Sequence, residues 1–454
     1  MCLPMRLKFS GVLCALILAV CAAPASAVRF GSSEPASCAT WTGSLCTGWS
    51  GGLGSYANQP LFQTLKAKLP LRYTRFSVPY NVLADYDRRN RRCRPSIPSA
   101  HPTVDDHGYQ RAGEGWDLLR SELALAHAQR LSVLVSITDG RVVRGAESDP
   151  AWPIPIYWDG KRYRPTAAGM DYSCGVAALI ARVAAEQRAL GAPPAQWEAF
   201  NEPDARRSYN GTLRGACRGP RNSCGASYRT LCGPRVGAAC GPLQAAWLYT
   251  RVASALRARR IPGKVAAGTF SKAGSYADAY MRQLIGTLRA RPAVISFHDY
   301  IDPTANSTAV AHGFAVRLYR EFGKRFELWI TESGVHLSEP TRLPREGGSS
   351  RSHGCEFGTS RAPGLVGLGR CIDGNSRAQA AGAASFKHRL AQLGSYRGVR
   401  ITELFWYQFQ ALPATATRPV QWDSGLLDAQ GVPRASYCAL VARTGCTGNP
   451  HRNR

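Results

Sequence analysis

Two glutamates stand where an apolar stretch of the sequence stops. Glu202 follows a run that ends at Phe200 and precedes Pro203, and Glu332 follows the run WIT at 329–331. A carboxylate at the mouth of a strand is well placed for chemistry. Two carboxylates about 5 Å apart can act on a glycosidic bond, one as general acid and the other as nucleophile. Their mutual repulsion in a cleft helps to keep the donor protonated. The question is whether the fold brings residues 202 and 332 together.

The elements around them alternate between β-rich runs and amphipathic helical stretches. Strands that read as continuous apolar runs are typical of a parallel sheet buried on both faces. The predicted strands are 28–31, 71–78, 131–138, 196–200, 264–270, 293–300, 326–331 and 401–409. The predicted helices are 60–69, 116–130, 175–190, 245–260, 276–291, 310–322, 376–393 and 435–443.

Strands that are each followed by a helix predict the α/β class and a (β/α)8 TIM barrel. An open doubly wound sheet is the alternative, but no Gly-x-Gly-x-x-Gly follows the first strand. The connections after strands are the long ones, at 79–112, 139–173, 203–243 and 333–375. In a barrel these loops share the catalytic face, and strands four and seven face each other across it. We therefore expect 28–454 to form a single catalytic barrel domain with a Cys-rich insertion at about 204–243.

The motif Asn201-Glu202-Pro203 at the fourth strand resembles the acid/base motif of the clan A glycoside hydrolases, which include families 5 and 39. The architectural resemblance runs from about residue 28 to the C-terminus, but only short motifs match. It implies that Glu202 is the general acid/base and that Asn201 bonds the sugar 2-hydroxyl. Glu332 falls where the clan keeps its nucleophile. The resemblance thus implies a retaining glycoside hydrolase that acts by double displacement, without a cofactor.

Three other elements resemble parts of the same clan. His298 and Tyr300 fit its His-x-Tyr element, in which the tyrosine touches the nucleophile and the histidine lines the sugar site. Arg75 resembles the arginine that orients the nucleophile. Trp406 resembles the tryptophan platform under the sugar ring, where an aromatic face suits the apolar face of a sugar.

Each residue also has a plainer interpretation. Glu202 can be an acid at a helix start, since Pro203 suits the first turn, and Glu332 can be a surface acid in a turn. His298 and Trp406 can be core residues, and Arg75 a structural ion-pair partner. Glu198 and Glu403 stay unassigned, and Glu198 is expected to point the same way as Phe200. A catalytically inactive barrel that binds a cell-surface or extracellular glycan is the alternative function.

The N-terminus predicts export. Arg6 and Lys8 precede the apolar run 12–22, and the small residues 25–27 form a cleavage site, so residues 1–27 are expected to be a signal peptide. No later stretch is long and apolar enough to predict a membrane span. The mature chain would be secreted.

Twelve cysteines remain beyond residue 27, an even number in a chain bound for an oxidising compartment. Pairing near neighbours leaves Cys93 and Cys174 to bridge two separate loops. No Cys-x-x-Cys or His-x-x-x-His occurs, so no metal site is expected. The disulfide candidates are Cys38, Cys46, Cys93, Cys174, Cys217, Cys224, Cys232, Cys240, Cys355, Cys371, Cys438 and Cys446.

The formal charge of +27 can indicate an anionic partner, an acidic polysaccharide in particular. General arginine bias is the alternative, because the excess is spread along the chain. No nucleic-acid module is present. If the loops after the second and fourth strands border the cleft, its field is positive and suits an anionic glycan. The arginines concerned are 88, 89, 91, 92 and 94, and 206, 207, 214, 218, 221, 229 and 235.

Overall fold

The structure is a computed structural model. It describes residues 29–34, 71–95, 114–138, 155–203, 240–270, 275–323, 325–335, 337–338, 372–373, 377–407, 425–426 and 433–441.

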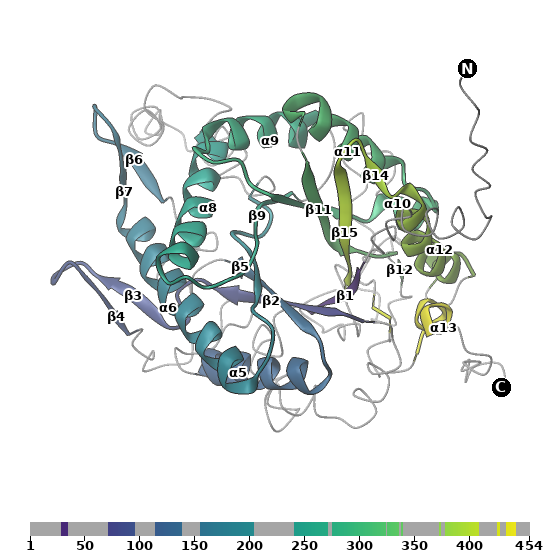
Figure 1. The fold of residues 1–454 in the computed structure, drawn as a ribbon, viewed down its shortest axis with the longest axis horizontal. Coiled ribbons are helices and arrows are strands. Elements are labelled where there is room, and N and C mark those ends of the chain that lie inside the picture. Colours follow the sequence, from purple (N-terminus) through teal and green to yellow (C-terminus); the bar gives the residue numbers. More distant parts are fainter. Residues whose placement is uncertain are drawn as a thin grey trace, which may run out of the picture.

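A closed parallel barrel forms the centre of the described residues. Its strands are all paired in parallel in chain order, and the first strand also pairs with the last, so the sheet closes (Figure 1). A short strand, β14 (Ser395–Tyr396), adds antiparallel to β15. The prediction of a (β/α)8 barrel is therefore confirmed. The barrel strands are β1 (Arg29–Glu34), β2 (Tyr73–Pro79), β5 (Ser132–Thr138), β8 (Gln196–Glu198), β9 (Val265–Phe270), β10 (Val294–Asp299), β11 (Phe326–Ser333) and β15 (Val399–Tyr407).

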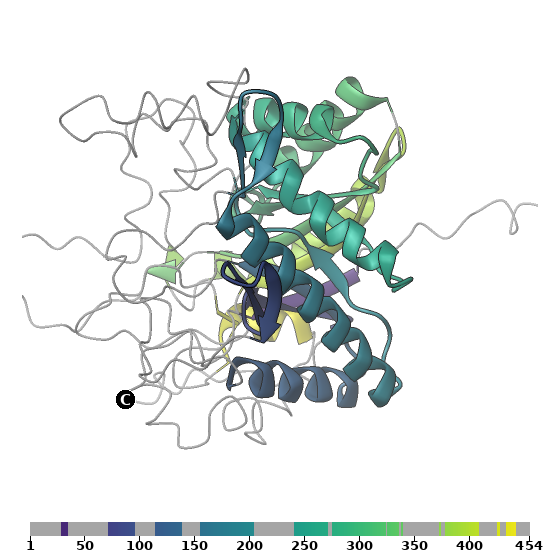
Figure 2. The ribbon, with the colours of Figure 1, turned by 90° about the vertical axis from the view of Figure 1, so that its left-hand side faces the viewer.

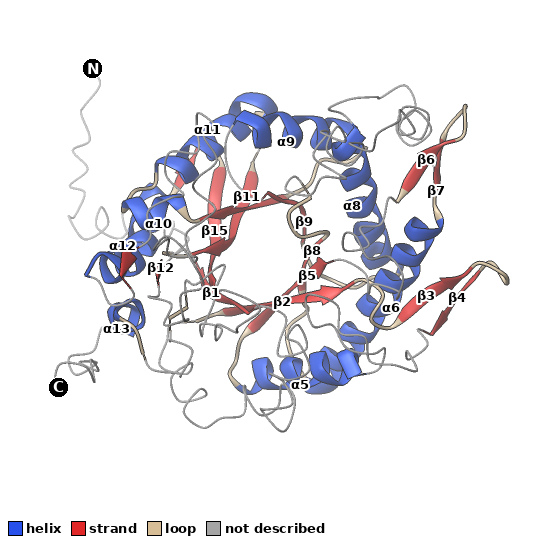
Figure 3. Ribbon diagram, turned by 180° about the vertical axis from the view of Figure 1, so that it is seen from behind, coloured by secondary structure: helices blue, strands red, loops and turns tan. Residues whose placement is uncertain are grey.

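Helices surround the barrel on its outer side (Figures 1 and 3). They are α5 (Glu114–Ala128), α6 (Ala167–Leu190), α8 (Cys240–Ala258), α9 (Ser275–Thr287), α10 (Ile301–Ala305), α11 (Ala309–Phe322), α12 (Arg377–Leu393) and α13 (Ala435–Val441). Seven of these eight helices correspond to predicted ones, although α6 begins at residue 167 rather than 175. The short helix α10 was not predicted, and the predicted helix 60–69 lies outside the described residues. Among the described residues, no helix combines the length and apolar character that a bilayer span requires.

Three small two-stranded sheets lie apart from the barrel. One is the antiparallel hairpin of β3 (Ala84–Asp87) and β4 (Arg92–Pro95). Another is the hairpin of β6 (Ile156–Trp158) and β7 (Tyr163–Pro165). The third pairs β12 (Leu337–Ser338) with β13 (Ile372–Asp373) in parallel.

Helix α6 shows how local sequence sets an element's limits. Thr166 precedes it, and its hydroxyl accepts a hydrogen bond from Gly169 N. Gly191 ends it in the left-handed conformation that favours glycine. Its apolar face, which includes Leu179 and Val183, is buried against the barrel.

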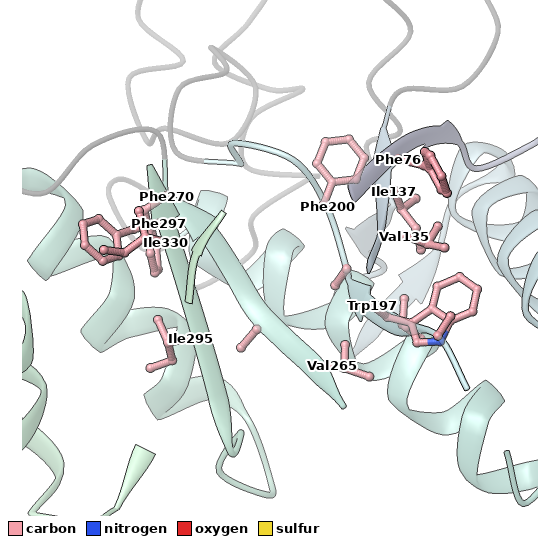
Figure 4. Close-up of a cluster of buried hydrophobic side chains, with 14 of the residues drawn as sticks. Phe76, Val135, Ile137, Trp197, Phe200, Val265, Phe270, Ile295, Phe297 and Ile330 are labelled. Carbon is pink, nitrogen blue, oxygen red and sulfur yellow. The ribbon is translucent and has the colours of Figure 1, made fainter. Parts of the chain in front are cut away.

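The core consists of two clusters of buried side chains. The inner cluster fills the barrel and consists of Tyr73, Leu134, Ala266, Val294, Trp329 and Phe405. The outer cluster lies between strands and helices. It includes Val135, Ile137, Trp197, Ile295, Phe297 and Ile330 from the strands and Leu179, Leu248, Leu284 and Phe314 from the helices, and Figure 4 shows part of it.

One disulfide is fully described, and it joins Cys93 to Cys174 as predicted. It links strand β4 to helix α6, rather than two loops. Cys438 is also disulfide-bonded, and its predicted partner Cys446 lies outside the described residues. Cys240 is the first residue of α8. The other candidates, residues 38, 46, 217, 224, 232, 355 and 371, lie outside the described residues, as do residues 1–27 and most of the predicted insertion.

Candidate active site

The acid motif follows strand β8 at the carboxyl end of the barrel. Asn201 donates its backbone N–H to Ile137 O at 2.9 Å and forms an isolated bridge with Thr269. Glu202 has φ 48°, a left-handed conformation that is unusual for a non-glycine residue. Such strain persists where the surroundings hold the backbone, often at a functional site.

Arg75 on β2 links the carboxyl ends of strands β5, β8 and β11. Its side chain is fully buried and donates to Glu332 Oε1 and Glu198 Oε2, each at 2.7 Å. It also donates to Asn201 Oδ1 at 2.7 Å and Ser136 Oγ at 2.9 Å. The planar guanidinium suits several acceptors at once. The prediction that Arg75 bonds the residue-332 carboxylate agrees with this geometry.

His298 and Tyr300 bridge the two acids. His298 Nδ1 lies 2.8 Å from Glu202 Oε1 and 3.3 Å from Glu332 Oε2. The Tyr300 hydroxyl donates to Glu332 Oε2 at 2.9 Å. Glu332 therefore contacts three donors from three elements, whereas His298 is the donor described for Glu202.

The two acids converge as the sequence predicts. One carboxylate oxygen of Glu202, one of Glu332 and one ring nitrogen of His298 all lie within 4.8 Å of one another. The Glu202 side chain is 28% exposed and the Glu332 side chain 12% exposed. The pair thus combines close carboxylates with a partly open site.

Electrostatics distinguish the members of this network. Burial alone would lower the pKa of His298. The Glu332 charge and the hydrogen bond to Glu202 together raise this pKa by more than burial lowers it, so the net shift is upward. Burial is the largest influence on Glu198 and would raise its pKa, but the Arg75 charge, the His298 charge and hydrogen bonds to the carboxylate together outweigh burial, so the net shift is downward. Burial and the Glu332 charge raise the pKa of Tyr300, which therefore stays a donor.

Two basic side chains, Arg75 and His298, therefore lie among three carboxylates, those of Glu198, Glu202 and Glu332.

The turn that carries Tyr300 is held by Asp299, which the sequence analysis missed. Asp299 Oδ1 accepts from Ile301 N at 3.2 Å and Asp302 N at 3.0 Å. Burial and the nearby Asp302 raise the pKa of Asp299 well above its usual range. An aspartate at a strand end just before a short helix is a cap signal that could have revealed this role.

Trp406 does not join the other predicted site residues. It is 1% exposed and belongs to the outer cluster. Leu328 pairs with Ile401 but Trp329 pairs with Glu403, so β15 carries an extra residue at Thr402. One extra residue reverses the alternation of side chains. The inward positions are then Phe405 and Tyr407, and the Tyr407 ring meets the Tyr300 ring edge-on, with the ring centroids 6.3 Å apart.

Glu198 also differs from the expectation. It points into the barrel toward Arg75, whereas Phe200 belongs to the outer cluster. The regular strand β8 ends at Glu198, so strict alternation does not extend to residue 200. Glu198 and Ser136 are thus network members that the sequence did not assign.

The arginines expected beside the cleft after the second strand lie elsewhere. Arg88, Arg89, Arg91, Arg92 and Arg94 belong to the β3–β4 hairpin. This hairpin packs on α6 and projects beyond the ring of helices (Figures 1 and 2). They therefore do not line the mouth of the barrel, and the second arginine group at 206–235 lies outside the described residues.

Glu202, His298 and Glu332 are also close enough to share a divalent cation. A histidine ligand must be neutral, whereas the carboxylates raise the pKa of His298. The buried guanidinium of Arg75 adds repulsion for a cation. The prediction that no metal or cofactor is used stays a prediction.

Comparisons with known proteins found similar backbones among solved structures but no match in sequence. No protein-family profile matches the sequence, and no curated protein matches it. The backbone is similar to the GH53 catalytic domain of Ignisphaera aggregans, with 16% identity, TM-score 0.49, and coverage of 93% of this chain and 97% of that chain. It is also similar to a GH5-4 broad specificity endoglucanase from Clostridium acetobutylicum, with 11% identity, TM-score 0.47, and coverage of 92% and 97%. An exo-beta-1,4-mannosidase from Opitutaceae bacterium strain TAV5 shares 12% identity, with TM-score 0.46 and coverage of 91% and 58%. The barrel assignment itself follows from the chain's own strand order.

Proposed function

We propose that the protein is a retaining glycoside hydrolase. The observation that carries the proposal is the approach of Glu202 and Glu332 within 4.8 Å at the carboxyl end of a (β/α)8 barrel. Retaining enzymes hold their carboxyl groups about 5–5.5 Å apart, whereas inverting enzymes leave about 6.5–9.5 Å for a water molecule. The short separation favours direct attack by one of the acids.

The contacts support a division of roles. Glu332, held by Arg75, Tyr300 and His298, is suited to attack the anomeric carbon as an ionised and oriented nucleophile. Glu202 is more exposed and is suited to protonate the leaving oxygen. The glycosidic bond breaks as the bond to Glu332 forms. Glu202 then takes a proton from water, and that water releases the sugar from Glu332.

Asn201 is oriented for the sugar. Its Oδ1 accepts from Arg75, which fixes the amide orientation and turns Nδ2 toward another acceptor. A sugar hydroxyl beside the anomeric carbon would supply it. Two inward side chains of β15 are aromatic, and we propose the later one, Tyr407, in place of Trp406 for contact with a sugar ring, because it meets Tyr300 edge-on.

The test compares Glu202→Gln and Glu332→Gln with the wild type on a panel of aryl glycosides. Glu321→Gln, on the outer helix α11, is the matched carboxylate control. We expect both site variants to lose at least 1,000-fold in kcat/KM, on the order of a lost catalytic group, while the control keeps its activity. Retention of sugar binding by the inactive variants would separate catalysis from folding.

Product stereochemistry decides the mechanism. Proton NMR of the first product should show the anomer of the substrate. The opposite anomer would reject the retaining mechanism, and a wild type that binds glycans but cleaves none of the panel would favour the inactive glycan-binding barrel.

We propose that the protein works outside the cell. The disulfide-bonded Cys93, Cys174 and Cys438 support this, because stable disulfides are typical of oxidising compartments. N-terminal sequencing of exported protein should begin near Val28. Retention of residues 1–27 in the mature chain would contradict the proposal.

An acidic polysaccharide is the substrate that the charge of +27 favours. Rates on matched neutral and uronic-acid polymers across a salt series test this. Equal rates with no salt dependence would reject it.

A further inference from the structure

A dense group of arginines lies on the β3–β4 hairpin, residues 84–95, here called the arginine hairpin. Its sequence is ADYDRRNRRCRP, in which five arginines face two aspartates, so its formal charge is +5 − 2 = +3. Figures 1 and 2 show it outside the ring of helices, beside α6. In the part of the chain that the structure describes, no hydrogen bond or ion pair joins this hairpin to the side chains of the candidate active site.

The tip of the hairpin is a defined turn. Asp87 Oδ1 accepts from the backbone N–H of Arg89 at 2.9 Å and of Asn90 at 3.1 Å, and Oδ2 accepts from the Asn90 side chain at 2.6 Å. These bonds lower the pKa of Asp87. The Asp87 carboxylate is thereby directed to the turn itself, and Arg91 completes the turn with φ 52°.

Two links join the hairpin to helix α6, and one ion pair lies within the hairpin. Cys93 is bonded to Cys174 of α6, and Tyr86 N donates to Asp171 of α6 at 2.7 Å. Within the hairpin, Arg94 pairs with Asp85 at 2.7 Å. The backbone that carries the arginines is therefore held in place before binding, so little conformational entropy of the hairpin would be lost when a ligand binds.

Four arginines of this hairpin face solvent. Arg88, Arg89, Arg91 and Arg92 are exposed, and none of them forms an ion pair with a described acid. The positive charges of these arginines repel one another, which costs free energy. A bound anion would reduce this repulsion.

We propose that the arginine hairpin binds the carboxylate groups of an acidic polysaccharide, outside the catalytic cleft. Guanidinium groups bind carboxylates in a bidentate manner, and a polyanion supplies such groups in series. The one aromatic side chain of the hairpin, Tyr86, is half-buried, and the arginine-rich residues 87–95 contain none for base stacking, which disfavours a single-stranded nucleic acid. The choice of a glycan rests on the proposed function. The hairpin would hold a polymer beside the enzyme while the cleft acts on it.

The test variant is Arg88→Gln/Arg89→Gln/Arg91→Asn/Arg92→Gln, in which asparagine suits the left-handed position. The matched control is Arg188→Gln/Arg257→Gln/Arg259→Gln/Arg289→Gln, which removes the same charge from exposed arginines at or just beyond the C-terminal ends of helices. Binding to polygalacturonate, neutral dextran and duplex DNA is measured by affinity electrophoresis at several salt concentrations.

We expect the hairpin variant to bind polygalacturonate at least tenfold more weakly. Its logarithmic salt slope should fall by about 3, since each of the four lost contacts releases about 0.7 counterion by analogy with a single-stranded polyanion. The control should bind like the wild type, and both should cleave a small aryl glycoside at the wild-type rate. Equal weakening in both variants, or none in either, would overturn the proposal, and so would tighter binding of the DNA. The Glu202→Gln protein should keep full binding, so loss of the proposed catalysis and loss of this site are distinguishable.

Discussion

Replacing Arg75 with methionine tests the charge balance of the site most directly. Arg75 is fully buried and donates to four side chains, two of them the carboxylates of Glu198 and Glu332. Methionine has a similar reach but no charge, so Glu198 is left as an uncompensated buried anion. Breaking a buried ion pair from one side costs about 3–5 kcal/mol in the free energy of unfolding.

The cost should depend on pH in a defined direction. In the wild type the pKa of Glu198 is lowered, so its contribution to stability is present above its ordinary pKa and is lost as pH falls. Without Arg75, burial raises the pKa of Glu198, and the variant instead loses stability as pH rises above that ordinary value. The gap between wild type and variant should therefore be wide at pH 7.5 and narrower at pH 4.5.

Urea unfolding, followed by tryptophan fluorescence with the disulfides intact, measures the free energy of unfolding of wild type and variant at pH 7.5 and at pH 4.5. Adding Glu198→Gln to Arg75→Met removes the unpaired charge and should recover part of the lost stability. Arg120→Met is the matched control, because its ion pair with Glu186 is exposed and should cost at most about 1 kcal/mol. A gap that does not change with pH, combined with no recovery in the double variant, would refute the charge-balance reasoning.

Three other substitutions test separate contacts. Tyr300→Phe removes one hydrogen bond to the Glu332 carboxylate, about 1.5–3 kcal/mol, so kcat should fall roughly 10- to 100-fold. An unchanged kcat would remove Tyr300 from the mechanism. Burial raises the pKa of Glu403 to about 8, so the wild type should lose stability between pH 4.5 and 8, while Glu403→Gln should not; parallel stability–pH curves would contradict this. Asp299→Asn resembles the protonated acid, so its unfolding midpoint should match the wild type near pH 4 and exceed it at higher pH, where the raised pKa of Asp299 makes ionisation costly. A lower midpoint at every pH would show that Asp299 acts as an ionised cap.

The barrel and the convergence of the acids could be predicted because both follow from strand order. Apolar runs fix the strands, and closure in chain order places the end of β8 opposite the end of β11. Glu202 and Glu332 then meet without any information about their side chains. The pairing of Cys93 with Cys174 was predictable only by elimination, since both cysteines had no near neighbour in the sequence.

The failures have a common physical cause, which is a break in strand regularity. The extra residue at Thr402 turns Trp406 outward, and the end of regular pairing at Glu198 separates the directions of Glu198 and Phe200. A bulge depends on how neighbouring strands pair, so a single strand's sequence does not reveal it. The placement of the arginine hairpin also depends on residues distant in the sequence, because the contacts that fix it come from α6. The sequence of the hairpin alone therefore does not reveal where it lies.

The inner cluster explains why the network above it is effective. Tyr73 lies two residues before Arg75 on β2, and Leu134 lies two residues before Ser136 on β5, so each apolar side chain sits one inward position below a polar one. This apolar layer excludes water from beneath the site, and charges interact more strongly where water is excluded. Arg75 then holds the Glu332 carboxylate in place, whereas the Glu202 side chain lies at the more exposed edge of the site. The same packing that stabilises the barrel thus separates a more buried, fixed carboxylate from a more exposed one.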